Sequence, residues 1–153
     1  MTGSPAVVEA LCKAQDLEAG LSLQYGLDAS CLKDMGVKKL AKRADKYSDD
    51  AEDYLDKLTD RILFLEGDPG FVVANIVAQS TVTELLQHEL DMEMALVDPY
   101  EGYVQIAMAA RDDTTRNLFE HLLKWHQKHI DWLEEQLALI DGLGEAAFIA
   151  QKI

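Results

Sequence analysis

The chain has 153 residues, 48% of them hydrophobic, which is enough for one domain with a continuous core and too little for two of ordinary size. Its formal charge of −14, from 28 acidic against 14 basic residues, argues against a nucleic-acid partner because phosphate binding needs clustered lysine and arginine. No run of about 20 apolar residues could span a bilayer and the first segment lacks a signal-peptide pattern, so we expect a cytoplasmic protein without a membrane partner.

The first half of the chain predicts two long helices. Apolar residues recur at three- and four-residue spacing over about residues 5–34, and this first helix ends at Gly36. The same spacing returns over about residues 38–66, where Gly67 and the following proline stop the second helix. Residues 67–81 have no helical period and are interpreted as a long crossover connection.

The second half repeats this organisation. A third helix is predicted over about residues 82–111 and a fourth over 113–141, with the cap of the fourth near Asp113. A short fifth helix is predicted over residues 145–152. Two helical hairpins joined by one long crossover predict an all-α four-helix bundle that forms a single domain over residues 1–153. A coiled-coil or cytokine-type bundle would fit the same spacing, so the polar residues of the core decide between them.

Four ionisable residues fall within the apolar stripes of these helices. They are Glu18 in the first helix, Glu93 in the third, and His126 and His129 in the fourth. A lone buried histidine is more often a core residue than a ligand, but buried charges need a partner or a metal. Four such groups from three helices indicate a metal-site ancestry, because one di-iron plan for bundles takes a Glu from two helices and a Glu-x-x-His pair from the other two. The aromatic residues Tyr25, Trp125 and Trp132 are interpreted as core or interface residues.

Several stretches of the chain resemble bacterioferritin. They are the Gln24-Tyr25 pair, residues 61–67, residues 129–134 and the tail at 150–153. The resemblance extends over the whole chain with about one deletion. It implies a ferritin-like fold and a closed shell of about 24 subunits built from antiparallel dimers, which stores ferric mineral and shares haem across each dimer two-fold axis.

Only part of the family's metal centre is retained in this sequence. Three of its ligand positions keep a ligand type, namely Glu18, Glu93 and His129. The other three are changed to Ala51, Tyr54 and His126, so both bridging carboxylates are missing. Without these bridges nothing holds two Fe(II) ions close together. The resemblance therefore implies a degenerate ferroxidase centre, and we do not expect this chain to be an enzyme.

The haem position and the iron-transfer position have changed as well. Glu52 stands where the family keeps its haem ligand, so we do not expect haem binding by this chain alone. The surrounding face is anionic, with Asp45, Asp49, Asp53 and Asp56. Near a dimer two-fold axis these charges would repel their own copies by roughly a few kcal/mol per close pair at a dielectric of about 20. Asp50 stands at the position that passes iron inward, whereas its companion histidine is Lys46.

Two functions compete on these observations. The first is an iron-storage shell subunit that is not catalytic itself and co-assembles with an intact, ferroxidase-active bacterioferritin-type subunit. The second is a metalloenzyme with one remodelled Fe or Zn site, formed by Glu93, His126 and His129, with Glu18 and Tyr54 as further candidates. An adaptor without any metal role ranks last, since it would leave buried carboxylates uncompensated.

Overall fold

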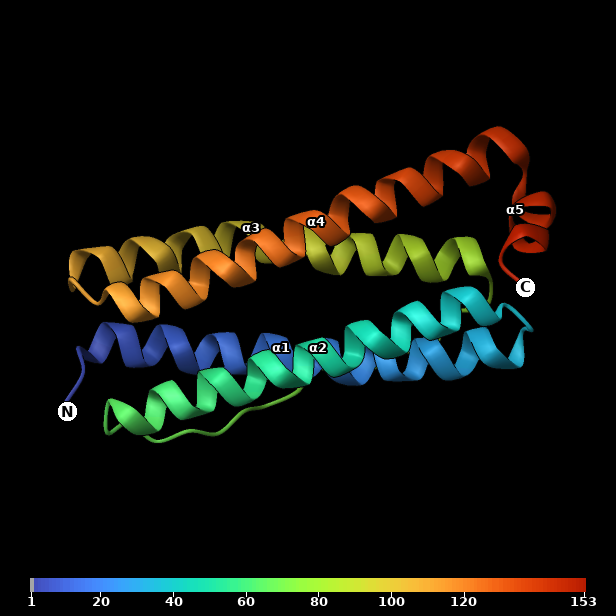
Figure 1. Ribbon diagram of the computed structural model, residues 1–153. Helices are drawn as coiled ribbons and strands as arrows, with labels where there is room; N and C mark the ends of the chain where they lie inside the picture. Colours follow the sequence, from blue (N-terminus) through green and yellow to red (C-terminus); the bar gives the residue numbers. More distant parts are fainter. Residues whose placement is uncertain (1) are drawn as a thin grey trace.

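The computed structural model describes residues 2–153, which form two long helical hairpins and a short final helix (Figure 1). The helices are α1 (Pro5–Asp34), α2 (Lys38–Phe64), α3 (Val82–Ala109), α4 (Asp113–Leu143) and α5 (Glu145–Gln151). The predicted all-α bundle is confirmed. Helices α2 and α3 end two residues earlier than the sequence pattern indicates, and α4 ends two residues later. None of the helices within residues 2–153 is long and apolar enough to cross a bilayer.

Helices α1, α2 and α3 end in the same kind of turn. Each is followed by a residue in the left-handed region, namely Gly36 (φ 80°), Glu66 (φ 62°) and Arg111 (φ 55°). The next amide then bonds back into the helix, from Val37 to Leu32, Gly67 to Ile62 and Asp112 to Ala107. This is a Schellman motif, which ends α2 at Phe64 although Gly67 is the residue that the sequence suggested. Gly67 instead allows close packing, because a Cβ there would lie 2.6 Å from Val8 Cγ1.

Side chains cap the start of α3 and of α4. Thr81 accepts a hydrogen bond from the Glu84 amide at 3.1 Å. For α4 the cap is Asp112 rather than the predicted Asp113, since the Asp112 carboxylate accepts from the Thr115 amide at 3.0 Å. Caps of this kind contribute about 1 kcal/mol each. The Arg61 guanidinium also donates to Asp112 at 2.8 Å, which ties the end of α2 to the turn between α3 and α4.

The two hairpins pack against each other mainly through α1 and α3. Helix α1 lies along α2, and α3 lies along α4, while the crossover returns along the first hairpin (Figure 1). Gln24 holds the crossover through two hydrogen bonds to Val77, donating to its carbonyl at 2.8 Å and accepting from its amide at 3.1 Å. Helix α5 packs on α3 and α4 at one end of the bundle. This arrangement brings the middle turns of four helices around one axis.

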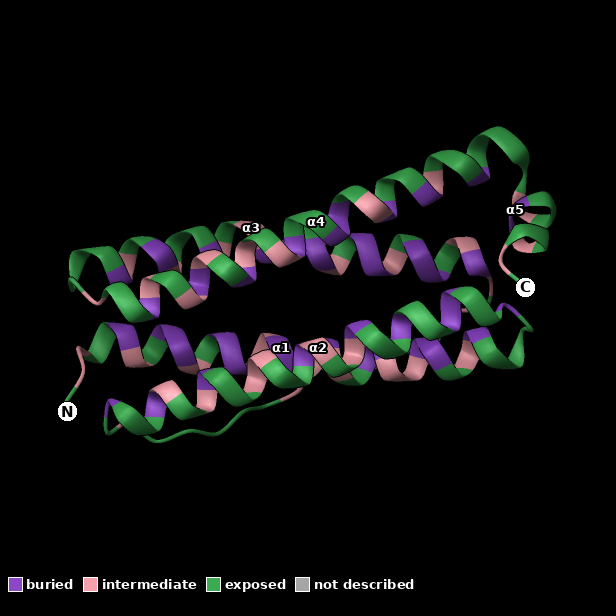
Figure 2. Ribbon diagram, in the orientation of Figure 1, coloured by how far each residue is buried: buried purple, intermediate pink, exposed green. Residues whose placement is uncertain are grey.

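The core runs along the inward faces of the four long helices, where Figure 2 shows the buried positions. Most of it is aliphatic and aromatic, as the periodic stripes predict. Ten polar residues are nevertheless buried: Gln15, Glu18, Gln24, Asp28, Glu89, Glu93, Thr115, His126, His129 and Gln136. Because buried polar groups need partners, these residues define where the chemistry of the bundle lies.

Candidate functional site

His126 of α4 lies at the centre of the bundle between two carboxylates. Its Nε2 is 2.7 Å from Glu18 Oε2 on α1, and its Nδ1 is 2.7 Å from Glu93 Oε2 on α3. All three side chains have no exposed surface. We refer to Glu18, His126 and Glu93 as the buried triad. It joins three helices through one imidazole ring.

Tyrosine hydroxyls add hydrogen bonds to both carboxylates of the buried triad. Tyr100 donates to Glu18 Oε2 at 2.5 Å, and Tyr25 donates to Glu93 Oε1 at 3.0 Å. Burial, reinforced by the neighbouring carboxylate, raises the pKa of both phenols well above their usual value. Both therefore stay protonated and act as donors. The Tyr47 hydroxyl lies 3.1 Å from His126 Nδ1, so a third phenol borders the ring.

His126 is a buried cation at neutral pH. Burial alone would lower its pKa, but the charges of Glu18 and Glu93 and the hydrogen bonds to them outweigh burial and raise the pKa to about 10. Both ring nitrogens then carry a proton and donate to carboxylates, which are strong charge-assisted bonds. One imidazolium between two carboxylates leaves one net negative charge, and the phenols stabilise it.

His129 lies one turn further along α4 and has no polar contact with the buried triad. Its side chain is 3% exposed, and neither ring nitrogen has a hydrogen-bond partner. The ring is stacked between Tyr47, at 3.8 Å between centroids, and Trp132, at 5.5 Å. Burial lowers the pKa of His129 to about 4, so the ring is neutral. The structure therefore brings together three of the four predicted core ionisable residues and sets His129 apart.

The remaining predicted positions lie on α2. Ala51 is buried and carries no ligand, while the half-buried ring of Tyr54 leans against Trp125 at 4.9 Å. Asp50 is bound by Lys46 at 3.1 Å, so the candidate iron-transfer carboxylate has a cation beside it. Glu52 is exposed on α2. So are its acidic neighbours Asp45, Asp49, Asp53 and Asp56.

The buried triad does not fit a pair of metal ions. Within residues 2–153, no group of three or more His, Cys, Asp or Glu side chains is arranged to hold one. The physical reason at the bundle centre is His126, whose ring nitrogens are bonded to the carboxylate oxygens that would face the ions. Its positive charge also opposes the approach of another cation.

A second buried acidic pair consists of Asp28 and Glu89, which were not among the predicted site residues. Asp28 is 0% and Glu89 2% exposed, and Gln24 donates to Asp28 at 2.9 Å. Burial and the hydrogen bond to Asp28 raise the pKa of Glu89 well above its usual value. Helical spacing could have found both residues, because Asp28 is three residues after Tyr25 and Glu89 is four before Glu93.

Comparisons with known proteins agree with the helical-bundle fold. The family described as ferritin-like domain matches residues 8–143. A bacterioferritin of Streptomyces coelicolor is 34% identical over 100% of this chain and 92% of its own length. A bacterioferritin of Brucella melitensis is 35% identical over 97% of this chain and 92% of its own length. A bacterial ferritin of Synechocystis is 32% identical over 94% of both chains.

Proposed function

The chain belongs to the ferritin family, and on that premise we propose that it is a cytoplasmic iron-storage shell subunit that does not oxidise iron itself. The iron-storage role rests on its similarity to bacterioferritins over essentially the full chain. The loss of oxidation rests on one observation, the His126 ring bonded on both sides to Glu18 and Glu93. These two conclusions are independent, so they are tested separately.

Iron oxidation at a di-iron centre needs two ions held together by bridging carboxylates. In this chain the positions expected to supply the bridges are Ala51 and His126. The imidazolium of His126 compensates one of the two carboxylate charges and the tyrosine hydroxyls stabilise the other, so the bundle core does not need iron for its stability. A subunit of this kind contributes cavity wall and surface carboxylates such as Asp50, where ferric mineral can nucleate.

The purified protein alone is expected to show no fast phase of aerobic Fe(II) oxidation at about two irons per subunit, because residues 2–153 offer no paired site that receives the ions. Stopped-flow absorbance of the ferric product measures this directly. The slow background rate should be the same for Glu18→Ala and for the exposed control His121→Ala. A rapid, saturating phase that Glu18→Ala abolishes would contradict the proposal.

We further propose that this subunit co-assembles with an intact, ferroxidase-active bacterioferritin-type subunit in a shell of about 24 chains. Its exposed acidic α2 face, centred on Glu52, supports this pairing. In a two-fold symmetric dimer this face would meet its own copy, whereas a less acidic partner would remove the repulsion. Charge complementarity selects partners mainly by penalising the wrong pairing. With Glu52 at the haem-ligand position, haem would have to be held by the partner.

Mixed dimers should therefore outcompete like dimers when both subunits are expressed together. Native mass spectrometry of the assembled shells, combined with haem and iron analysis, reports partner, stoichiometry and cofactor at once. Raising the ionic strength should weaken the preference, since salt screens exposed charges beyond roughly 8 to 10 Å. Fully assembled, haem-containing shells of this chain alone at low salt would exclude the partner proposal.

A second candidate function is a metalloenzyme with a single Fe or Zn ion. It is favoured by the unpartnered ring nitrogens of His129 and by Glu18 Oε1, which also lacks a hydrogen bond. On this alternative the protein binds about one divalent metal per subunit, and His126→Ala and His129→Ala each lower that stoichiometry, whereas His121→Ala does not. On the main proposal no tight site is present. Metal analysis after dialysis against each ion separates the two functions.

A further inference from the structure

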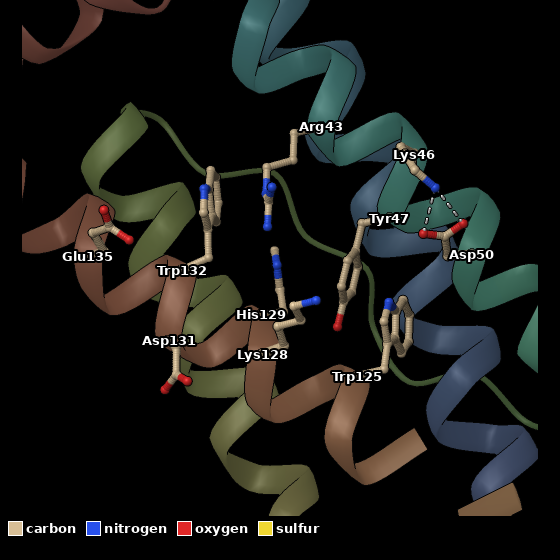
Figure 3. A pocket seen from close by; sticks show the side chains of 10 residues that line it. All are labelled: Arg43, Lys46, Tyr47, Asp50, Trp125, Lys128, His129, Asp131, Trp132 and Glu135. Carbon is tan, nitrogen blue, oxygen red and sulfur yellow. Dashed lines mark hydrogen bonds and ion pairs between the residues drawn. The ribbon is translucent and has the colours of Figure 1, made fainter. Parts of the chain in front are cut away.

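A pocket of about 450 Å³ opens between α2 and α4, next to the buried triad. Its walls carry aromatic rings and cations, including Tyr47, Trp125, Trp132, Arg43 and Lys128. Figure 3 shows Arg43 and His129 lying between the rings of Trp132 and Tyr47. This volume lies within the range of small-molecule sites, roughly 300 to 1,000 Å³. Asp50 at the rim has a role in the storage proposal, but neither that proposal nor the buried triad explains the aromatic and cationic walls of the pocket.

The pocket is built on a row of stacked rings. Trp132 is stacked on His129 with an interplanar angle of 12°, and His129 is stacked on Tyr47 at 25°. Tyr47 is in turn stacked on Trp125 at 4.2 Å and 12°. We refer to these four residues as the aromatic row. Because neighbouring rings cover the faces within the row, the row offers mainly ring edges, whose positive character favours edge-to-face contact with a planar aromatic ligand.

Two cations of the pocket have no carboxylate partner. Lys46 is paired with Asp50, but the structure of residues 2–153 contains no ion pair to Arg43 or Lys128. The Arg43 guanidinium lies 3.8 Å above the Trp132 ring, so it is held at the aromatic row. The acidic lining residues Asp131 and Glu135 point away from that row in Figure 3. Beside the rings the pocket is therefore suited to a negative charge.

His129 provides an independent indication of a ligand. It lines the pocket, its side chain is 3% exposed, and neither of its ring nitrogens has a partner. A buried donor or acceptor without a partner is unfavourable and is rare in native proteins. A bound group that accepts a hydrogen bond from the N–H of His129 would satisfy that donor. The same group could also accept from the guanidinium of Arg43.

We propose that this pocket binds a small planar aromatic carboxylate. The ring of the ligand lies against the aromatic row, and its carboxylate accepts hydrogen bonds from Arg43 and from the N–H of His129. A guanidinium matches the two oxygens of a carboxylate in geometry and charge, which a lone lysine does not. Lys128 adds attraction without fixing the orientation. This site makes no use of iron or of the buried triad.

Tryptophan fluorescence provides a direct test, because Trp125 and Trp132 are the only tryptophans and both line the pocket. The probe is 4-nitrobenzoate, a planar carboxylate that quenches indole emission, with neutral 4-nitrobenzamide as its matched analogue. We expect saturable quenching by the carboxylate, confirmed by calorimetry, and at least roughly tenfold weaker binding of the amide. Arg43→Gln should weaken carboxylate binding by a similar factor. The exposed control Lys124→Gln should leave it unchanged.

The variant His129→Phe keeps an aromatic ring in the row and removes only the ring nitrogens, so it tests the hydrogen bond apart from the stacking. It should weaken the carboxylate several-fold, with circular dichroism confirming that both variants remain folded. No saturable binding, equal binding of acid and amide, or unchanged binding in both variants would overturn the proposal. Competition by inorganic phosphate alone would instead identify a general anion site, and saturable quenching by Zn²⁺ that His129→Phe removes would identify a metal site. Either result would also overturn it.

Discussion

Replacing His126 by alanine is expected to lower the free energy of unfolding by roughly 3 to 5 kcal/mol. The change removes the imidazolium that lies between Glu18 and Glu93. Two fully buried carboxylates then remain without a positive charge between them. The change also leaves a cavity where the imidazole was, which adds to the loss. Urea denaturation at pH 7 and a fixed protein concentration, followed by helical circular dichroism, measures the difference.

The matched control is His121→Ala, because His121 lies on the same helix and is exposed. Its effect should stay within about 0.5 kcal/mol, as for most surface substitutions. A His126→Ala effect as small as that of the control would contradict the assignment of His126 as a structural cation. The comparison cancels the change in helix propensity, since both variants place the same residue in α4.

A second variant separates charge from packing. Glu18→Gln, Glu93→Gln and His126→Leu together replace the buried triad by neutral residues of similar volume. Replacing a buried ionic group as a whole is often neutral or stabilising, whereas breaking it is strongly destabilising. The triple variant should therefore recover most of the stability that His126→Ala loses. Failure to recover it would indicate that packing around His126, rather than its charge, dominates.

The fold could be predicted from the sequence because helix periodicity is a local property. The three- and four-residue spacing located the four long helices, the short fifth helix was also predicted, and the predicted ends differ by two residues or fewer from the structure. At the ends of α2 and α3 the differences arise from Glu66 and Arg111, which adopt a left-handed conformation that glycine would normally signal. The cap at Asp112 was missed by one residue for a similar reason. Asp112 and Asp113 have the same side chain, and only the conformation of the backbone turn decides which of them caps α4.

The burial of the candidate site could also be predicted, but its bonding could not. The stripes placed Glu18, Glu93, His126 and His129 in the core, and all four are buried. Register on a helix fixes which way a residue faces, whereas the side-chain rotamer decides what it contacts. His126 therefore bonds two carboxylates, while His129, one turn away, is stacked between aromatic rings.

The aromatic row was not predicted, because it depends on contacts between two helices that the crossover separates in sequence. Tyr47 is contributed by α2, and its stacking partners Trp125 and His129 are contributed by α4. Taken alone, each of these aromatic residues is predicted only to be a core or interface residue. Only the relative rotation of α2 and α4 stacks them into one surface.

The stability of the protein should fall as the pH rises from about 6.5 to about 10, because His126 binds a proton more tightly in the folded state. Its pKa is raised to about 10 by the two carboxylates, against 6.5 for an unperturbed histidine. Between these values the folded state holds one proton more than the unfolded state. The free energy of unfolding then decreases by roughly 1.4 kcal/mol per pH unit. Below pH 6.5 this contribution is complete and stops changing.

Other groups also titrate at alkaline pH, so the measurement is the difference in unfolding free energy between the wild-type protein and the neutral triple variant. Both carry the same lysines, aspartates and exposed acidic face, and these contributions cancel in the subtraction. The wild-type value minus the triple-variant value should fall steadily in urea titrations at pH 6, 7, 8 and 9. A difference that is constant over this range would mean that His126 is already neutral in the folded protein. In that case the bundle centre would hold no resident cation, and the physical obstacle to metal binding proposed for this subunit would disappear with it.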